Sequence, residues 1–285
     1  PIQQNESVGI RRIGVELEMI GLEIDAISKI VAAQVNGEVK IHSPFEHDVQ
    51  GDAAGTWVVE LDYDYLKKKG REEKGSDTPL DKVEEIALSV LKAGAEKVVP
   101  MEVVSPPLSM ERLEEIVQLV DKLREAGARG TTDGLVYAFG MQFNPEVPAT
   151  DSDTIVRYFK AFLCLYDWLK MRAQVDYTRR LTAYIDPFPV DYVKLVVAKD
   201  YWPDTSSFID DYLDANPTRN RALDMLPLFA ELDEQRVRAK VNDSRIKSRP
   251  TFHYRLPNCE IDRQDWNIHL AWRDWLQVEY LANDR

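Results

Sequence analysis

Apolar side chains recur at every second position in several short segments of the first half of the chain. Residues 10–20 show this most clearly, because the alternation runs from Ile13 to Met19 without a break. A period of two over this length predicts a half-buried strand. The same reasoning predicts four further strands, at 35–41, 57–61, 98–104 and 135–143.

Segments with helical periodicity separate and follow these strands. Thr78-Pro79 is a capping pair that predicts a helix over 79–92, preceded by a charged loop at 70–77. Apolar stripes predict further helices from residue 109 to 127 and over 151–175. The second half is helix-rich, with helices expected at 208–213, 222–233 and 266–281 and strands at 192–198 and 251–256. No linker is evident, so we expect one domain over 1–285 with a helix-rich insertion at roughly 151–235.

The composition is that of a soluble globular protein. The 285 residues are 44% hydrophobic and 30% charged, and no stretch approaches the ~18 consecutive apolar residues of a membrane span. The first residues lack the basic and apolar pattern of a signal peptide. Cys164 and Cys259 are therefore expected to be reduced thiols, and the protein to be cytoplasmic without a membrane partner.

The charge balance excludes one class of partner. Forty-nine acidic against thirty-six basic residues give a net charge of -13, which repels a nucleic-acid backbone. A nucleotide remains compatible with such a surface, because divalent cations can lie between carboxylates and phosphates.

Two segments place carboxylates on one side of a predicted strand. Glu16 and Glu18 share a face, and so do Glu60, Asp62 and Asp64. Neighbouring like charges repel unless a cation lies between them, and oxygen ligands suit Mg²⁺. The alternative for the first pair is a solvated strand face, and for the second set an acidic turn.

Two more segments carry charge in informative surroundings. Glu102 lies in an otherwise apolar strand, where a buried charge requires a partner. If 249–255 is a strand, Arg249, His253 and Arg255 share its face with Thr251. Arginine forks suit polyphosphate, although an exposed strand paired with acids is an equal alternative.

Taken together, these motifs resemble a known family. The resemblance covers residues 11–262 and rests on the order and spacing of segments 14–18, 57–62, 102–108, 216–224 and 249–258. In these segments the chain is similar to the amidoligases of the carboxylate-amine ligase superfamily, which includes glutamine synthetase and glutamate–cysteine ligase.

The resemblance implies an α+β fold like the glutamine synthetase catalytic domain. A curved antiparallel sheet would bind ATP and Mg²⁺ on its concave face, with helices packed on the other side. Glu16 and Glu18 would hold metal, and Glu60 and Glu102 would hold metal or orient substrate. His253 takes the place of a metal-binding glutamate, although imidazole suits Mg²⁺ less well.

The resemblance also implies roles for polar residues outside the acidic strands. Gln142 and Asn144 stand where relatives often carry histidines, and would contact cofactor or substrate. Arg219 and Arg221 could meet nucleotide or substrate, or form surface ion pairs.

The expected reaction is ATP- and Mg²⁺-dependent joining of a carboxylate to an amine through an acyl phosphate. Arg255 and Arg249 would grip phosphate, and Glu60 or Asp62 would accept the proton of the amine. The substrates would be small molecules or peptides, and a homo-oligomer is compatible with this function. The alternatives are a metal-dependent hydrolase using the same carboxylates, and a noncatalytic regulator that binds a nucleotide or peptide.

Overall fold

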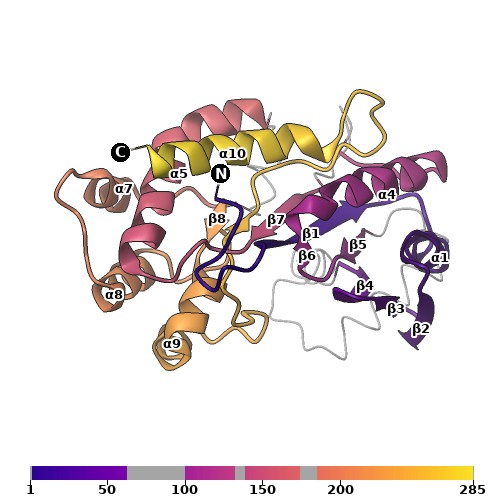
Figure 1. Ribbon diagram of the computed structural model, residues 1–285, viewed down its shortest axis with the longest axis horizontal. Coiled ribbons are helices and arrows are strands. Elements are labelled where there is room, and N and C mark those ends of the chain that lie inside the picture. Colours follow the sequence, from indigo (N-terminus) through magenta and orange to yellow (C-terminus); the bar gives the residue numbers. More distant parts are fainter. Residues whose placement is uncertain (1, 63–99, 132–138, 174–184, 285) are drawn as a thin grey trace, which may run out of the picture.

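The computed structural model describes residues 2–62, 100–131, 139–173 and 185–284 (Figure 1). The loop predicted at 70–77, the helix predicted at 79–92, Asp64 and parts of two predicted strands lie outside these residues. Within them, nine strands form one open sheet in the order β2-β3-β4-β5-β1-β7-β9-β8, with β6 also paired to β1. The strands are β1 (Arg12–Met19), β2 (Glu38–Ser43), β3 (Glu46–Asp52), β4 (Gly55–Leu61), β5 (Met101–Val104), β6 (Leu108–Ser109), β7 (Met141–Pro145), β8 (Leu223–Asp224) and β9 (His253–Tyr254).

Helices make up the rest of the regular structure. The pairings between the described strands are antiparallel, so the expected α+β class is confirmed. A short 3₁₀ turn at Met110–Arg112 leads into α4. The helices are α1 (Ile24–Val35), α4 (Leu113–Glu125), α5 (Ser152–Arg172), α7 (Val190–Val197), α8 (Thr205–Ala215), α9 (Leu226–Lys240) and α10 (Ile268–Asn283).

The alternation in β1 divides the sheet into an apolar and a polar face. Val15 and Leu17 are buried, whereas Glu16 and Glu18 are only half-buried. This is the predicted orientation of the strand. Because β1 is central and pairs with β5, β6 and β7, its two glutamates lie in the middle of the polar face.

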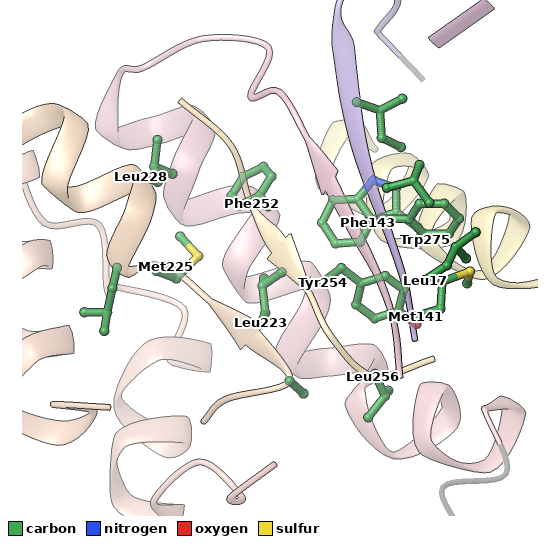
Figure 2. Close-up of a cluster of buried hydrophobic side chains, with 14 of the residues drawn as sticks. Leu17, Met141, Phe143, Leu223, Met225, Leu228, Phe252, Tyr254, Leu256 and Trp275 are labelled. Carbon is green, nitrogen blue, oxygen red and sulfur yellow. The ribbon is translucent and has the colours of Figure 1, made fainter. Parts of the chain in front are cut away.

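Helices α5 and α10 cover the apolar face (Figure 1). Tyr254 of β9 contacts Phe162 of α5 edge-on and lies 5.3 Å from Trp275 of α10, measured between ring centroids. Figure 2 shows the resulting cluster, in which Phe143 of β7 and Leu17 of β1 lie beside Tyr254 and Trp275. Helix α1 packs against β3, β4 and α4. Burial of this side leaves the opposite side of the strands available for polar residues.

Three of the described α-helices begin where a side chain caps them, and one of them is α8, where the carboxylate of Asp204 accepts from the N–H of Ser207. The carboxylate of Asp151 accepts a hydrogen bond from the backbone N–H of Thr154 at the start of α5, where the helix expected over 151–175 was predicted to begin. The side chain of Asn267 accepts from the N–H of His269 at the start of α10, which confirms a closing helix near 266–281.

Four predictions of secondary structure require correction. The helix expected at 222–233 begins only at Leu226, because Leu223 and Asp224 form strand β8. The strand expected at 192–198 is helix α7, because Tyr192 and Val196 are four residues apart and bury one helical side next to α5. The helix α1 was missed, and the strand expected at 35–41 begins only at Glu38. The strand expected at 251–256 is reduced to His253–Tyr254, with Thr251 forming an isolated bridge.

The proposed domain division stays a prediction. Strand β8 belongs to the stretch expected as an insertion, yet it pairs with β9 and so extends the main sheet.

Both cysteines are free, with Cys164 exposed and Cys259 buried. In the described part of the chain, no helix has the length and apolar character that crossing a membrane requires.

Candidate functional site

Three glutamates from adjacent strands form a row across the polar face of the sheet. Glu102 of β5 pairs directly with Glu60 of β4 on one side and with Glu18 of β1 on the other. We call these three residues the glutamate row. Directly opposed residues in antiparallel strands have Cβ atoms about 4.5–5.5 Å apart, and like charges in such positions are destabilising. The row is therefore an arrangement that folding alone does not favour.

The electrostatic cost of the row is concentrated on Glu102. Part of this side chain reaches the surface, but its carboxyl group lies deep among protein atoms, and this burial is the main reason why its pKa is raised well above the usual value. Four neighbouring carboxylates raise the pKa of Glu102 further, namely Glu16, Glu18, Asp62 and Glu60. Within the described residues, Glu102 forms no hydrogen bond or ion pair that would offset them.

The chemistry of these residues fits a hard divalent cation. Carboxylate oxygens are the ligands that Mg²⁺ prefers, and a cation would offset the mutual repulsion of the glutamate row. The described residues do not contain three or more carboxylate, imidazole or thiol groups already converged on one metal position. The donor set thus fits the ion, but the side chains would have to converge to bind it.

Two amide side chains continue the polar face beyond the glutamates. On β7, Gln142 pairs with Glu16 and Asn144 pairs with Gly14. Both amides donate to the same carboxylate oxygen, Oε1 of Glu16, at 3.1 Å from Gln142 Nε2 and 2.6 Å from Asn144 Nδ2. Gln142 Nε2 also lies 2.7 Å from Asn144 Oδ1. We call Gln142 and Asn144 the amide bridge.

Gly14 gives the amide bridge its space. A Cβ atom at this position would lie 3.3 Å from Asn144 Nδ2 and 3.4 Å from Asn144 Cβ. These distances are shorter than comfortable van der Waals contact, so a larger residue would push Asn144 away from Glu16. The first residue of the Gly14–Glu18 motif therefore positions a side chain on the next strand.

Beyond the amide bridge, the polar face becomes basic. His253 of β9 lies within 2.9 Å of Gln142, measured from Nδ1 to Nε2. Burial lowers the pKa of His253 well below its usual value, and the positive charges of Arg255, Arg249 and Arg219 lower it further. We call these three arginines the basic cluster. Arg255 also donates to the backbone carbonyl of Arg219 at 2.8 Å, which ties β9 to the loop before β8.

Asp224 lies on the same face and lessens the positive charge of the cluster. It pairs with His253 across β8 and β9. Burial raises the pKa of Asp224 to about 6, although Arg255 and Arg219 oppose the rise, as does the hydrogen bond from the N–H of Leu226. Near neutral pH this carboxyl group can therefore hold or release a proton.

One polar face thus carries carboxylates at one end and guanidinium groups at the other. A family model described as "putative amidoligase enzyme" matches residues 9–277 of the chain. The chain belongs to this family. No match was found among curated proteins or among solved structures. Membership of the family indicates a ligase that forms amide bonds.

The structure brings together eleven of the twelve site residues predicted for this amidoligase. One group surrounds Glu102 on β1, β4 and β5, and the other surrounds His253. These eleven residues are Glu16, Glu18, Glu60, Asp62, Glu102, Gln142, Asn144, Arg219, Arg249, His253 and Arg255. Their roles stay predictions, because proximity does not establish chemistry.

Arg221 is the residue that lies apart. Its guanidinium donates to Asn216 Oδ1 and to the carbonyl of Pro187, each at 2.8 Å, and lies over the ring of Phe188. These contacts are those of a buried residue that holds the turn before β8. Arg249 also differs from expectation, since it lies outside β9 and is exposed, yet its charge still acts on His253.

Sequence reasoning missed two residues of the amidoligase site. Asp224 lies in the segment 216–224 that carried the family resemblance, but nothing in the pattern of that segment indicated a buried carboxyl group. Gly14 opens the Gly14–Glu18 motif, and its close approach to Asn144 depends on strand pairing that the sequence does not specify.

Proposed function

We propose that this amidoligase joins a carboxylate to an amine with ATP and Mg²⁺, through an acyl-phosphate intermediate. The observation that carries the proposal is the division of one sheet face into the glutamate row and the basic cluster, joined by the amide bridge. Transfer of a phosphoryl group requires neutralisation of negative charge from cations on more than one side. A face of this kind offers arginines directly and carboxylates that fit a divalent ion.

We further propose that the fold is that of the glutamine synthetase catalytic domain, with a curved sheet. An antiparallel sheet with polar chemistry on one face and helices α5 and α10 on the other supports this proposal. Free cysteines fit the proposed cytoplasmic location. A homo-oligomer is part of the proposal.

Glu16, Glu18 and Glu102 are the residues that would hold Mg²⁺. The bound ion would supply neutralisation of phosphate charge. Glu16 is already oriented by the amide bridge, and Glu18 Oε2 accepts from the backbone N–H of Gly140 at 2.6 Å. Fixed carboxylates of this kind lose less conformational freedom when they bind a ligand.

The reaction needs two displacements. A carboxylate oxygen of the substrate attacks the γ-phosphorus of ATP, and the bond to the bridging oxygen breaks to release ADP. Arg255, with Arg249 nearby, would stabilise the charge that spreads over the transferred group. An amine then attacks the acyl carbon, phosphate leaves, and Glu60 or Asp62 would take the proton of the amine.

The test is steady-state release of ADP and formation of amide, measured with panels of carboxylates and amines. The ligase predicts turnover that requires both substrates and is abolished by chelation of Mg²⁺. A hydrolase would cleave amides without ATP, and a regulator would bind nucleotide without turnover; either result would contradict the proposal.

A variant sharpens this test. Arg255→Lys keeps the charge but loses the planar fork, so turnover should fall by about 10³-fold, as when a phosphate-binding arginine is lost. Arg236→Lys is the matched control, because Arg236 of α9 forms its ion pairs with Asp210 and Asp233 and is not one of the predicted site residues. A near-normal rate of ADP release in Arg255→Lys would show that Arg255 does not stabilise the transferred phosphoryl group.

A further inference from the structure

The charge of Glu16 fixes the orientation of both amide side chains. An amide places its NH₂ group, and not its oxygen, against a carboxylate. Asn144 therefore presents Nδ2 to Glu16 at 2.6 Å and turns Oδ1 toward Gln142. Gln142 must then turn its own NH₂ group toward Glu16 Oε1 and Asn144 Oδ1, and because this group also faces His253 Nδ1, its two hydrogens are shared among three acceptors. Reversal of either amide would bring two oxygens together.

The orientation of Gln142 decides the tautomer of His253. The group that lies 2.9 Å from His253 Nδ1 is the NH₂ of Gln142, which can donate but cannot accept. Nδ1 must therefore be the unprotonated nitrogen of a neutral imidazole, so the proton is on Nε2. The charges of Arg255, Arg249 and Arg219 also keep the imidazole neutral.

The Nε2–H group that results has no partner among the described residues. It is a buried side-chain atom without a hydrogen bond, on a residue whose surface is only 8% exposed. An unpaired buried donor costs free energy and calls for an explanation. The charges around Nε2 are positive, and a nitrogen that carries a proton cannot bind a metal ion. The missing partner must therefore accept a hydrogen bond and be compatible with positive surroundings, and an anion meets both requirements.

We infer that His253 donates a hydrogen bond from Nε2 to an anionic oxygen of the bound substrates, a phosphoryl or a carboxylate oxygen, and does not ligate metal. This inference rests on the proposed function of the same face. The side chain of Arg249 is exposed, forms no hydrogen bond or ion pair among the described residues, and acts on His253 through its charge, so it can help to hold an anion at Nε2. The chain Glu16–amide bridge–His253 would then couple the acidic and basic ends of the face.

The tautomer can be tested without turnover. In protein labelled with ¹⁵N-histidine, long-range ¹H–¹⁵N spectra distinguish protonated from unprotonated ring nitrogens in each of the four histidines. The signal that is missing from the spectrum of His253→Gln belongs to His253. We expect a proton on Nε2 alone between about pH 6 and pH 8, the range in which a free imidazole would titrate. A proton on Nδ1, or a charged ring, would overturn the inference. In Gln142→Ala the proton of His253 should be distributed between Nδ1 and Nε2, whereas in Gln277→Ala, a control on α10, it should stay on Nε2.

The ligand class is tested by binding of inorganic triphosphate, acetate and Mn²⁺, each measured separately by calorimetry. His253→Leu should weaken anion binding by about tenfold or more, as expected when a hydrogen bond to a charged group is lost. His253→Gln retains an NH₂ group near the position of Nε2 and should recover most of the affinity. If His253→Leu loses triphosphate binding, the acceptor of the Nε2–H hydrogen bond is a phosphoryl oxygen. If it loses acetate binding, the acceptor is a carboxylate oxygen.

Mn²⁺ affinity should be the same in all three proteins. The inference is wrong if His253→Leu leaves both anions unaffected, if the wild type binds neither anion, or if Mn²⁺ affinity falls in His253→Leu. Thermal unfolding of each variant checks that it is folded. The protonation of the ring is measured in the wild-type protein, and His253→Gln serves only to assign the signal. A wild type that binds anions through His253 but makes no amide would contradict the ligase proposal alone.

Discussion

Two parts of the molecule bury charge in opposite ways. Arg11 and Glu279 are completely buried and form a bidentate ion pair, with distances of 3.0 and 2.9 Å. Further hydrogen bonds surround the pair, from Arg11 Nε to the carbonyl of Glu146 and from Trp275 Nε1 to Glu279. The glutamate row instead places carboxylates opposite one another around a Glu102 with no ion pair among the described residues.

The difference separates a structural from a functional use of charge. A buried charge that is fully paired adds to the specificity of folding, whereas a cluster of like charges is stable only when something else offsets it. Perturbed carboxyl groups of the second kind tend to mark sites where a ligand binds. The ion pair links the residue just before β1 to α10, and β1 carries Glu16 and Glu18 on its polar side.

The largest effect is expected from breaking the buried pair. Glu279→Leu would leave Arg11 charged and unpaired in the interior, which should lower the free energy of unfolding by about 3–5 kcal/mol. Urea unfolding of the purified protein measures this. Asp191→Asn removes one partner of an exposed pair with Lys194 and should change the same quantity by less than ~0.5 kcal/mol. Equal losses in the two variants would contradict the comparison.

The next effect concerns the space beside Gly14. Gly14→Ala should displace Asn144 from Glu16 and lower turnover by about 10²-fold, because small misplacements of catalytic groups have effects of this size. The fold should tolerate the methyl group, since alanine is no worse than glycine in an extended strand.

A double-mutant cycle tests the route of this effect. In an Asn144→Ala background, Gly14→Ala should lower turnover little further, because the clashing side chain is gone. Additive losses in the two variants would show that Gly14 acts by another route.

The smallest effect on stability is expected from relieving the repulsion within the glutamate row. Glu102→Gln should raise the free energy of unfolding by about 1 kcal/mol in the absence of divalent ions, because a neutral amide replaces the one carboxyl group that directly opposes both Glu18 and Glu60. It should nevertheless abolish turnover if Glu102 holds metal. A loss of stability in Glu102→Gln would contradict the view that its charge is uncompensated.

The pH dependence supplies a second measurement of the same feature. The pKa of Glu102 is higher in the folded than in the unfolded protein, so the folded state binds more protons and stability falls as pH rises. The destabilising contribution is absent below the unfolded pKa and complete above the raised folded pKa. Glu102→Gln should therefore flatten the decline of the unfolding free energy across this window, as measured by denaturation at a series of pH values.

The sequence predicted those features that depend on local periodicity. The alternation from Ile13 to Met19 located β1 and its polar face, and Asp151 marked the start of α5, because both depend on residues close in sequence. Residues 192–198 are rich in valine and read as a strand, but burial of Tyr192 and Val196 beside α5 favours the helix. Tertiary packing overrides a weak local preference of this kind.

The arrangement of the site could be predicted only in part. The sequence identified Glu18, Glu60 and Glu102 as candidates but not as neighbours in one row, since register depends on which strands pair. The hydrogen bonds of the amide bridge could not be foreseen for the same reason. Arg221 looked equivalent to Arg219, and only burial against Phe188 distinguishes the two.

The order of strands in the sheet has a consequence for how the protein folds during synthesis. Glu16 and Asn144 are 128 residues apart in sequence, and Gln142 is another 111 residues from His253. Contacts so distant in sequence form slowly, because long loops must close first. A nascent chain would therefore carry the repelling carboxylates of β1, β4 and β5 well before β9 leaves the ribosome, and the last strand to be made completes the face.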